Sequence, residues 1–336
     1  MFQNKTILVT GGTGSFGKKF VKKLLNSFKC KKIIIFSRDE LKQFELREAL
    51  SQHKRSKSLR FFLGDIRDKS RLLTALNNVD YVVHCAALKQ IESAEYNSQE
   101  VVKTNILGTQ NVIEACIEKN VKKVISLSTD KAVDPANLYG ATKLAADKLT
   151  ISSNLLSVHK DTIFSVVRYG NVINSRGSVI PFFKTLIKKK SKFLPLTHNE
   201  MTRFFITLDD SVEFVIKAFY RMKGGEVFIP KLPSIKIKDI IKALDPKIKI
   251  KITGIRPGEK IHEILCPSTA AYLTLDFKDH FVLKPSIIIN KNYKINALKE
   301  KGKLVQKDFV YSSDKNKKFL NIREIQKIIH GNDDTL

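Results

Sequence analysis

The first half of the chain alternates short runs of branched apolar residues with longer stretches whose apolar positions repeat at the helical period. Uninterrupted β-branched runs are typical of strands that are buried on both faces of a parallel sheet. The predicted strands cover residues 6–10, 32–36, 59–63, 79–85, 123–128 and 164–168. Strands that alternate with helices imply right-handed crossovers, so we expect an α/β fold with a doubly wound parallel sheet.

The regular alternation ends near residue 170, and prolines and glycines then divide the chain into shorter segments. We therefore expect two domains, a larger one over residues 1–170 and a smaller mixed α/β domain over residues 171–336. Residues 202–222 form a strand-like run followed by a helical pattern. We expect this segment to return to the first domain.

A glycine-rich turn joins the first predicted strand to a helix predicted over residues 18–26. Glycines let the backbone approach a pyrophosphate closely, and the N-terminus of a helix offers free N–H groups. The spacing is GxxGxxG rather than GxGxxG, but its strand–turn–helix context predicts a dinucleotide site in a Rossmann-type domain. The residues assigned to this site are Gly11, Thr13, Gly14, Ser15, Phe16 and Gly17.

The end of the second strand is where a Rossmann-type domain reads the ribose of its cofactor. An acidic residue there selects NAD, whereas an arginine accommodates the 2′-phosphate of NADP. Here Ser37 and Arg38 come before Asp39, so the sequence favours NADP. The alternative is that Arg38 is an ordinary surface charge.

Further cofactor contacts are predicted where the third and fourth strands end and on the helix that follows. Asp65 comes directly after the third strand, where its carboxylate could accept from the adenine amine or cap the next helix. Small side chains after the fourth strand suit close approach of the nicotinamide ribose. Asn105 is assigned to the cofactor site but is interpreted mainly as a structural hydrogen-bonding residue. The whole set is Asp65, Ile66, Ala86, Ala87, Lys89 and Asn105.

The fifth strand leads into a polar loop that holds Thr129, Asp130 and Lys131, and a helix then carries Tyr139 and Lys143. Residues four apart share one face of a helix, so the phenol and the amine can point to one spot. A phenol titrates near about pH 10 in water, and a nearby lysine cation lowers its pKa. The pair thus predicts a base that takes a hydroxyl proton during hydride transfer. The alternative is a half-buried tyrosine beside a solvated lysine.

Composition narrows the class of protein. The chain of 336 residues is 43% hydrophobic and shows no signal peptide, and no apolar run reaches the roughly 18 residues of a membrane span. Its four cysteines are dispersed without a CxxC pair, so we expect no metal, no disulfide and a cytoplasmic location. The net charge of +27 could indicate nucleic acid or an anionic membrane, but the basic residues are spread along the chain. We expect neither partner; a basic field would also attract a diphosphate substrate.

Three motifs in order give the chain a specific resemblance. Residues 10–17, the Tyr139/Lys143 pair and residues 168–171 resemble those of extended short-chain dehydrogenases/reductases. A closer similarity is to the UDP-N-acetylglucosamine 4,6-dehydratases that invert C5, the first enzymes of pseudaminic acid biosynthesis. This similarity spans essentially the whole chain and is carried by residues 128–149, 166–172, 175–183, 201–217, 224–234, 254–263 and 308–313.

The resemblance implies NADP on the first domain, a UDP-sugar on the second, and a homo-oligomer that is a dimer or a hexamer. It also implies a transient oxidation at C4, which acidifies the C5 proton. Tyr139, tuned by Lys143, would take the C4 hydroxyl proton, and Thr129 would bond the C4 oxygen. Lys131, as a neutral amine, would take the C5 proton, and Asp130 would protonate the leaving C6 hydroxyl. Lys131 needs a lowered pKa for this role, and the charge of Asp130 opposes that shift.

Substrate contacts are assigned to Lys89, Asn171, Arg203, Arg256 and Glu259. Arg256 can hold phosphate oxygens and Glu259 the nucleotide ribose, or the two can form a structural pair around the Pro-Gly turn. The expected product is UDP-2-acetamido-2,6-dideoxy-β-L-arabino-hex-4-ulose. The competing interpretations are a configuration-retaining dehydratase, a UDP-sugar 4-epimerase, a non-catalytic nucleotide-binding regulator and a nucleic-acid binder.

Overall fold

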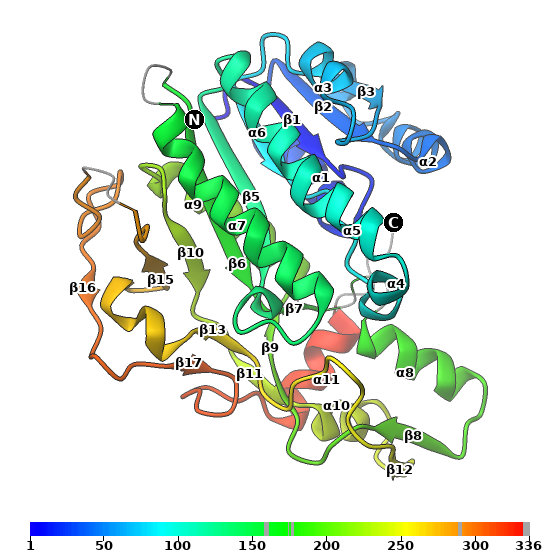
Figure 1. The fold of residues 1–336 in the computed structure, drawn as a ribbon. Helices are drawn as coiled ribbons and strands as arrows, with labels where there is room; N and C mark the ends of the chain where they lie inside the picture. Colours follow the sequence, from blue (N-terminus) through cyan, green and yellow to red (C-terminus); the bar gives the residue numbers. More distant parts are fainter. Residues whose placement is uncertain (158–160, 174, 176–177, 288–290, 332–336) are drawn as a thin grey trace.

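A single large sheet runs through the molecule in the computed structural model, which describes residues 1–157, 161–173, 175, 178–287 and 291–331 (Figure 1). Its parallel part has the strand order β3-β2-β1-β4-β5-β6-β10. The first six of these strands confirm the predicted ones, and the doubly wound α/β fold is confirmed with them. Their bounds are β1 Thr6–Thr10, β2 Lys32–Ser37, β3 Leu59–Leu63, β4 Tyr81–His84, β5 Lys123–Thr129, β6 Ile163–Tyr169 and β10 Val227–Pro230.

Strands from the C-terminal part of the chain extend this sheet. β15 (His280–Leu283) pairs antiparallel with β10, and β14 (Thr274–Asp276) and β16 (Lys303–Leu304) follow it. The periodicity of the sequence did not predict these strands, because runs of two to four residues are too short to show one.

Helices cover both faces of the parallel strands. On one face α1 (Ser15–Ser27) packs against α9 (Leu208–Arg221), and on the other α6 (Gly108–Glu118) packs against α7 (Leu138–Leu156). Alternate residues of β1 enter the two cores, which explains why the strand is apolar throughout. The remaining helices of this part are α2 Glu40–Leu50, η1 Ser56–Ser58, α3 Lys69–Ala75, α4 Ile91–Tyr96, α5 Ser98–Val102, η2 Lys103–Leu107 and η3 Asp130–Ala132.

A smaller unit with its own apolar core lies beside the carboxyl ends of the parallel strands (Figure 1). In it β9 (Thr202–Ile206) pairs with β7 (Asn171–Val172) and β11 (Ser234–Lys236), whereas α9, which follows β9, lies against α1. The segment 202–222 is thus divided between the two units. The other elements are α8 Val179–Lys188, β8 Phe193–Leu196, α10 Ile237–Leu244, β12 Lys249–Ile252, β13 Ile264–Cys266, η4 Ser268–Leu273, β17 Tyr311–Ser312 and α11 Ile322–Gly331.

Part of one motif that carries the resemblance, Arg176 and Gly177, lies outside the described residues. Among the residues that are described, no helix combines the length and the apolarity needed to cross a membrane.

Candidate active site

The glycine-rich turn lies between β1 and α1 and is lined by backbone. Gly11 has a φ of +62°, and a Cβ there would lie 2.9 Å from the Ala86 nitrogen. A Cβ at Gly17 would lie 2.6 Å from the carbonyl oxygen of Gly11. Gly14, the N-cap of α1, supplies no side-chain acceptor to the first turn. The turn therefore requires glycine, and the first N–H groups of α1 have no side-chain cap, which is the arrangement that a pyrophosphate needs.

The residues that were predicted to read the ribose and adenine lie at the ends of β2 and β3. Asp39 is occupied, because its carboxylate caps α2 by accepting from the Lys42 nitrogen at 2.9 Å. Arg38 is half-exposed and lies 3.5 Å from the Asp65 carboxylate. Asp65 is held by Arg67 at 2.7 Å. The next helix, α3, is capped by Asp68, so the alternative of Asp65 as that cap is wrong.

The segment after β4 is fixed from behind by Asn105. Its side-chain oxygen accepts from the Leu88 nitrogen at 2.8 Å, and its amide donates to the Leu88 carbonyl at 2.9 Å and to Thr142 at 3.1 Å. This bears out the structural interpretation of Asn105. Ala86 and Ala87 are partly buried beside the glycine turn, and Lys89 is exposed at the end of the segment.

The predicted catalytic residues come from β5, η3 and the start of α7. The Thr129 hydroxyl donates to Asp130 Oδ1 at 2.9 Å. Asn137 caps α7 by accepting from the Gly140 nitrogen at 2.8 Å. A Cβ at Gly140 would overlap the carbonyl oxygen of Lys131, so this glycine lets α7 pack directly on η3. The first turn of α7 thereby carries Tyr139 close to the Asp130–Lys131 loop.

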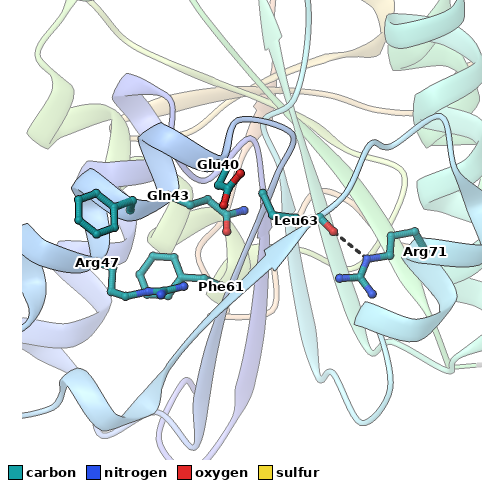
Figure 2. A pocket seen from close by; sticks show the side chains of 7 residues that line it. Glu40, Gln43, Arg47, Phe61, Leu63 and Arg71 are labelled. Carbon is teal, nitrogen blue, oxygen red and sulfur yellow. Dashed lines mark hydrogen bonds between the residues drawn. The ribbon is translucent and has the colours of Figure 1, made fainter.

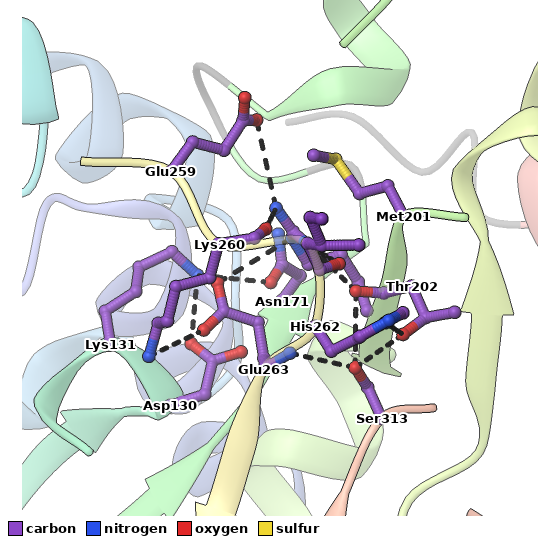
Figure 3. Close-up of polar contacts among 12 residues, drawn as sticks. Asp130, Lys131, Asn171, Met201, Thr202, Glu259, Lys260, His262, Glu263 and Ser313 are labelled. Carbon is purple, nitrogen blue, oxygen red and sulfur yellow. Dashed lines mark hydrogen bonds and ion pairs between the residues drawn. The ribbon is translucent and has the colours of Figure 1, made fainter. Parts of the chain in front are cut away.

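Lys131 lies between two carboxylates from distant parts of the chain (Figure 3). Its Nζ is 2.9 Å from Asp130 Oδ1 and 3.3 Å from Glu263 Oε1, and it also contacts Asn171 Oδ1 at 3.4 Å. Asp130 is fully buried, and its Oδ2 has no hydrogen-bond partner within the described ranges. An unpartnered carboxyl oxygen in a buried site is costly unless it carries a proton or meets a ligand.

Burial and charge shift the pKa values of this loop. Burial raises the pKa of Asp130 despite the neighbouring Lys131 cation. Burial alone would lower the pKa of Lys131, but the carboxylates of Asp130 and Glu263 hold it well above its usual value. The lowered pKa that a neutral Lys131 requires is therefore not present in the substrate-free protein. Asp130 matches the behaviour of an acid, and Lys131 is a protonated amine at rest.

The Tyr139/Lys143 pair also differs from expectation. Burial raises the pKa of Tyr139 to about 12, and the opposing influences come from the Lys131 charge and the Thr129 hydrogen bond. Lys143 is buried, which lowers its own pKa, and Asp147 partly offsets this. In the protein alone, the largest influences that lower the pKa of Tyr139 come from the Lys131 charge and the Thr129 hydrogen bond, and the predicted effect of Lys143 stays a prediction.

The predicted substrate residues lie near this loop but are differently engaged. Arg203 donates to the Ile261 carbonyl at 2.9 Å and to the Lys260 carbonyl at 2.8 Å, so its guanidinium holds the 254–263 segment. Arg256 is exposed and pairs with Glu259 at 3.1 Å, which is the structural pair considered as the alternative.

Residues 7–285 match the family that is described as polysaccharide biosynthesis protein. The chain belongs to this family. This family member is 54% identical to the UDP-N-acetylglucosamine 4,6-dehydratase (inverting) of Campylobacter jejuni subsp. jejuni serotype O:23/36 (strain 81-176), over 98% of both chains. It is 40% identical to the UDP-glucose 4-epimerase of Rickettsia conorii (strain ATCC VR-613 / Malish 7), over 98% of this chain and 96% of the relative. The X-ray structure of Pen from Bacillus thuringiensis superposes with a TM-score of 0.88, at 36% identity and with 98% of each chain covered.

These similarities confirm the resemblance that the motifs indicated. Two buried carboxylates, Asp147 and Glu263, act electrostatically on the predicted catalytic residues, although the sequence analysis did not assign them to the site. Asp147 accepts from Ser128 at 2.6 Å and from Arg168 at 3.1 Å, and it lies one turn beyond Lys143 on α7. The sequence could have identified Asp147, because it lies four residues after Lys143 and therefore on the same face of the helix. Glu263 could not be identified in this way, because only the tertiary fold brings it to Lys131.

A shallow cavity of about 260 Å³ lies elsewhere, between α2 and β3 (Figure 2). Arg47 stacks over the Phe61 ring at 5.0 Å, and Arg71 donates to the Leu63 carbonyl at 2.7 Å. None of the predicted site residues lines this cavity. We therefore take the polar cluster around Lys131 as the candidate active site. Nowhere in the described part of the chain do three or more His, Cys, Asp or Glu side chains lie close enough together to hold a metal ion.

Proposed function

We propose that this protein removes water from UDP-N-acetylglucosamine across C5 and C6 with inversion at C5, using NADP, to give UDP-2-acetamido-2,6-dideoxy-β-L-arabino-hex-4-ulose. The observation that carries the proposal is the pair of the buried Asp130 carboxylate and the Lys131 amine beside Tyr139. Loss of water needs an acid and a base on adjacent carbons in addition to the residue that serves C4. The inverting dehydratase of Campylobacter jejuni, at 54% identity, supports the same assignment.

The chain's residues fit a nicotinamide dinucleotide. A side chain at Gly11 or Gly17 would collide with backbone, so these glycines permit the tight turn that leads into α1. The first N–H groups of α1 have no side-chain cap and could meet a pyrophosphate. Because Asp39 is occupied as the cap of α2, Arg38 is left as the charged group that could meet a 2′-phosphate, which supports NADP. When bound, the cofactor would supply the reversible hydride transfer that the reaction needs between C4 and C6.

The protein's own residues would carry the proton transfers. Tyr139 takes the proton of the C4 hydroxyl, and Thr129 holds the C4 oxygen. The C4 ketone that results acidifies C5–H, and Lys131 accepts this proton once it is neutral. Asp130 donates its proton to the C6 oxygen, which leaves as water, and a proton then adds at C5 from the opposite face. Two protons are taken and two are returned, so the net change is the loss of one water.

Contacts to the nucleotide and sugar are proposed for Lys89, Asn171, Arg256 and Glu259, with Arg203 holding the loop that carries two of them. The resemblance further supports a cytoplasmic homo-oligomer, dimeric or hexameric, whose product enters pseudaminic acid biosynthesis.

The second candidate is a UDP-sugar 4-epimerase, which the 40% identity to the Rickettsia conorii relative favours. An epimerase needs no acid at C6, so the buried Asp130 would have no task in it. Incubation with UDP-N-acetylglucosamine distinguishes the two. We expect a product that is lighter by one water and shows a C6 methyl signal by NMR. A product of unchanged mass with an inverted C4 would establish the epimerase instead.

The cofactor assignment has its own test. Arg38→Ala should raise the KM for NADP by about tenfold or more while leaving that for NAD nearly unchanged, because only the 2′-phosphate meets this guanidinium. Arg60→Ala, an exposed arginine on β3, is the matched control. Equal effects of Arg38→Ala on both cofactors would contradict the assignment.

A further inference from the structure

Glu263 lies just before β13, 132 positions after Lys131 in the sequence, yet its carboxylate is buried against three cations. Its oxygens lie 3.3 Å from the Nζ of Lys131, 3.3 Å from the Nζ of Lys260 and 3.7 Å from the Nε of Arg203. A buried carboxylate among three cations is ionised, and these charges lower the pKa of Glu263 against the effect of burial.

The position of Glu263 is fixed by the backbone on both sides. Its N–H donates to Ser313 Oγ at 2.9 Å, and the Ser313 N–H donates to its carbonyl oxygen at 2.8 Å. Lys260 donates to the Val133 carbonyl at 2.8 Å, so the segment is tied to the loop that follows Lys131. The carboxylate is therefore held in place and is not a mobile surface group.

Several charged or titratable groups face Lys131 from the surrounding elements. From η3 comes Asp130, from β9 Arg203, and from the segment before β13 come Lys260 and Glu263. The wider set adds Lys89 after β4, Tyr139 on α7, and Glu259 and His262 near Glu263. Glu263 is the one member of this set that contacts Lys131 and also contacts two further cations.

We propose that Glu263 is a positioning residue of the reaction: it holds the Lys131 amine in place and, with Lys260 and Arg203 as its counter-charges, sets the pH at which that amine can accept the C5 proton. This role rests on the proposed function, because it requires Lys131 to act at C5. Glu263 itself need not touch the sugar, since it acts through Lys131.

The two sides of this arrangement make opposite predictions. Glu263→Gln removes a negative charge beside the ammonium, so the amine loses its proton at lower pH. The ascending limb of kcat/KM against pH should therefore move down by about one unit or more. Lys260→Met removes one of the cations that contact the Glu263 carboxylate. The negative charge of Glu263 then stabilises the Lys131 ammonium more strongly, which raises the pKa of Lys131. The same limb should then move up.

The experiment is the pH profile of water loss from UDP-N-acetylglucosamine, measured with the full-length wild type, Glu263→Gln and Lys260→Met. Glu263→Asp keeps the charge, so its limb should stay near that of the wild type while kcat falls. Glu226→Gln is the matched control: Glu226 is equally buried but accepts from Ser165 and Gly224, both at 2.7 Å, in the other unit. It should lose stability without moving the profile.

Opposite shifts in the two variants support the role, because a merely structural loss would move both limbs alike or neither. An unmoved limb in Glu263→Gln, or shifts of the same sign in both variants, overturns it. If Glu263→Gln does not fold, the direction of the shift in Lys260→Met decides. Absence of water loss from the wild type would instead overturn the proposed function, so the two failures are distinguishable.

Discussion

Two clusters of charged side chains, each built from distant segments, differ in how deeply their carboxylates are buried. The active cluster consists of Asp130, Lys131, Arg203, Lys260 and Glu263. The remote cluster consists of Arg221, Asp279 and Glu300, where α9 meets the antiparallel extension of the sheet. Both bring carboxylates to basic side chains at hydrogen-bonding distance, so pairing alone does not distinguish them.

In the remote cluster the two carboxylates are held by direct hydrogen bonds from one arginine. The buried Arg221 donates from Nη2 to both oxygens of Asp279 at 2.9 and 3.0 Å, and from Nε to Glu300 at 2.8 Å. The Arg221 hydrogen bond lowers the pKa of Glu300, and for Asp279 the bonds from His280 and Arg221 outweigh burial and lower its pKa too. Both carboxylates remain about two-fifths exposed, so water assists their ionisation.

In the active cluster both carboxylates are buried, and the balance between burial and charge changes for Asp130. Asp130 is fully buried, and burial raises its pKa although Lys131 lies 2.9 Å away. A carboxyl with a raised pKa next to an amine lets one proton be shared between them. The comparison teaches that the burial of the carboxylates, rather than the number of ion pairs, distinguishes the active cluster from the remote one.

The largest expected effect is that of Tyr139→Phe. Removing the phenol takes away the group that accepts the C4 proton, so kcat should fall by about a thousandfold or more. The melting temperature should hardly change, because the ring stays. NMR of the products measures the rate, and Tyr81→Phe, at a buried tyrosine that begins β4, serves as the control. Retained activity in Tyr139→Phe would remove this residue from the reaction.

Next in size are the variants that split the Asp130–Lys131 pair. Lys131→Ala should abolish solvent deuterium exchange at C5 of recovered substrate, because no amine remains to take that proton. Asp130→Asn should keep the exchange but lose dehydration by about a hundredfold or more, because the C6 oxygen then lacks its acid. Unchanged C5 exchange in Lys131→Ala would assign the base to another residue.

A smaller effect, on stability alone, is expected for Arg221→Met in the remote cluster. Loss of the charged hydrogen bonds should lower the free energy of unfolding by about 2 kcal/mol, a value reduced for the exposure of both carboxylates. Because the folded pKa values of Asp279 and Glu300 lie below their unfolded values, this stability is present above about pH 4 and is lost on further acidification. Denaturant unfolding at several pH values measures it. A reduced kcat in the folded variant would contradict the separation of the two clusters.

The local part of this architecture could be predicted from the sequence. Six parallel strands, the glycine turn and the Tyr139/Lys143 spacing are encoded in short windows, and the structure contains them. The pKa directions and the contact between Glu263 and Lys131 could not be predicted, because they depend on burial and on the fold of the 254–263 segment over η3. For the same reason Arg203, assigned to substrate from sequence, is found holding that segment.

The central claim is that the acid and amine of the active cluster act on neighbouring carbons of the sugar from whose C4 hydroxyl Tyr139 takes the proton. The most direct test is wild-type turnover of UDP-N-acetylglucosamine in D₂O, with NMR of carbon 5 in the product. We predict a 4-keto-6-deoxy sugar of L-arabino configuration that carries one deuterium at C5. A product that retains the C5 configuration of the substrate, or one with C5 still protonated, would contradict it.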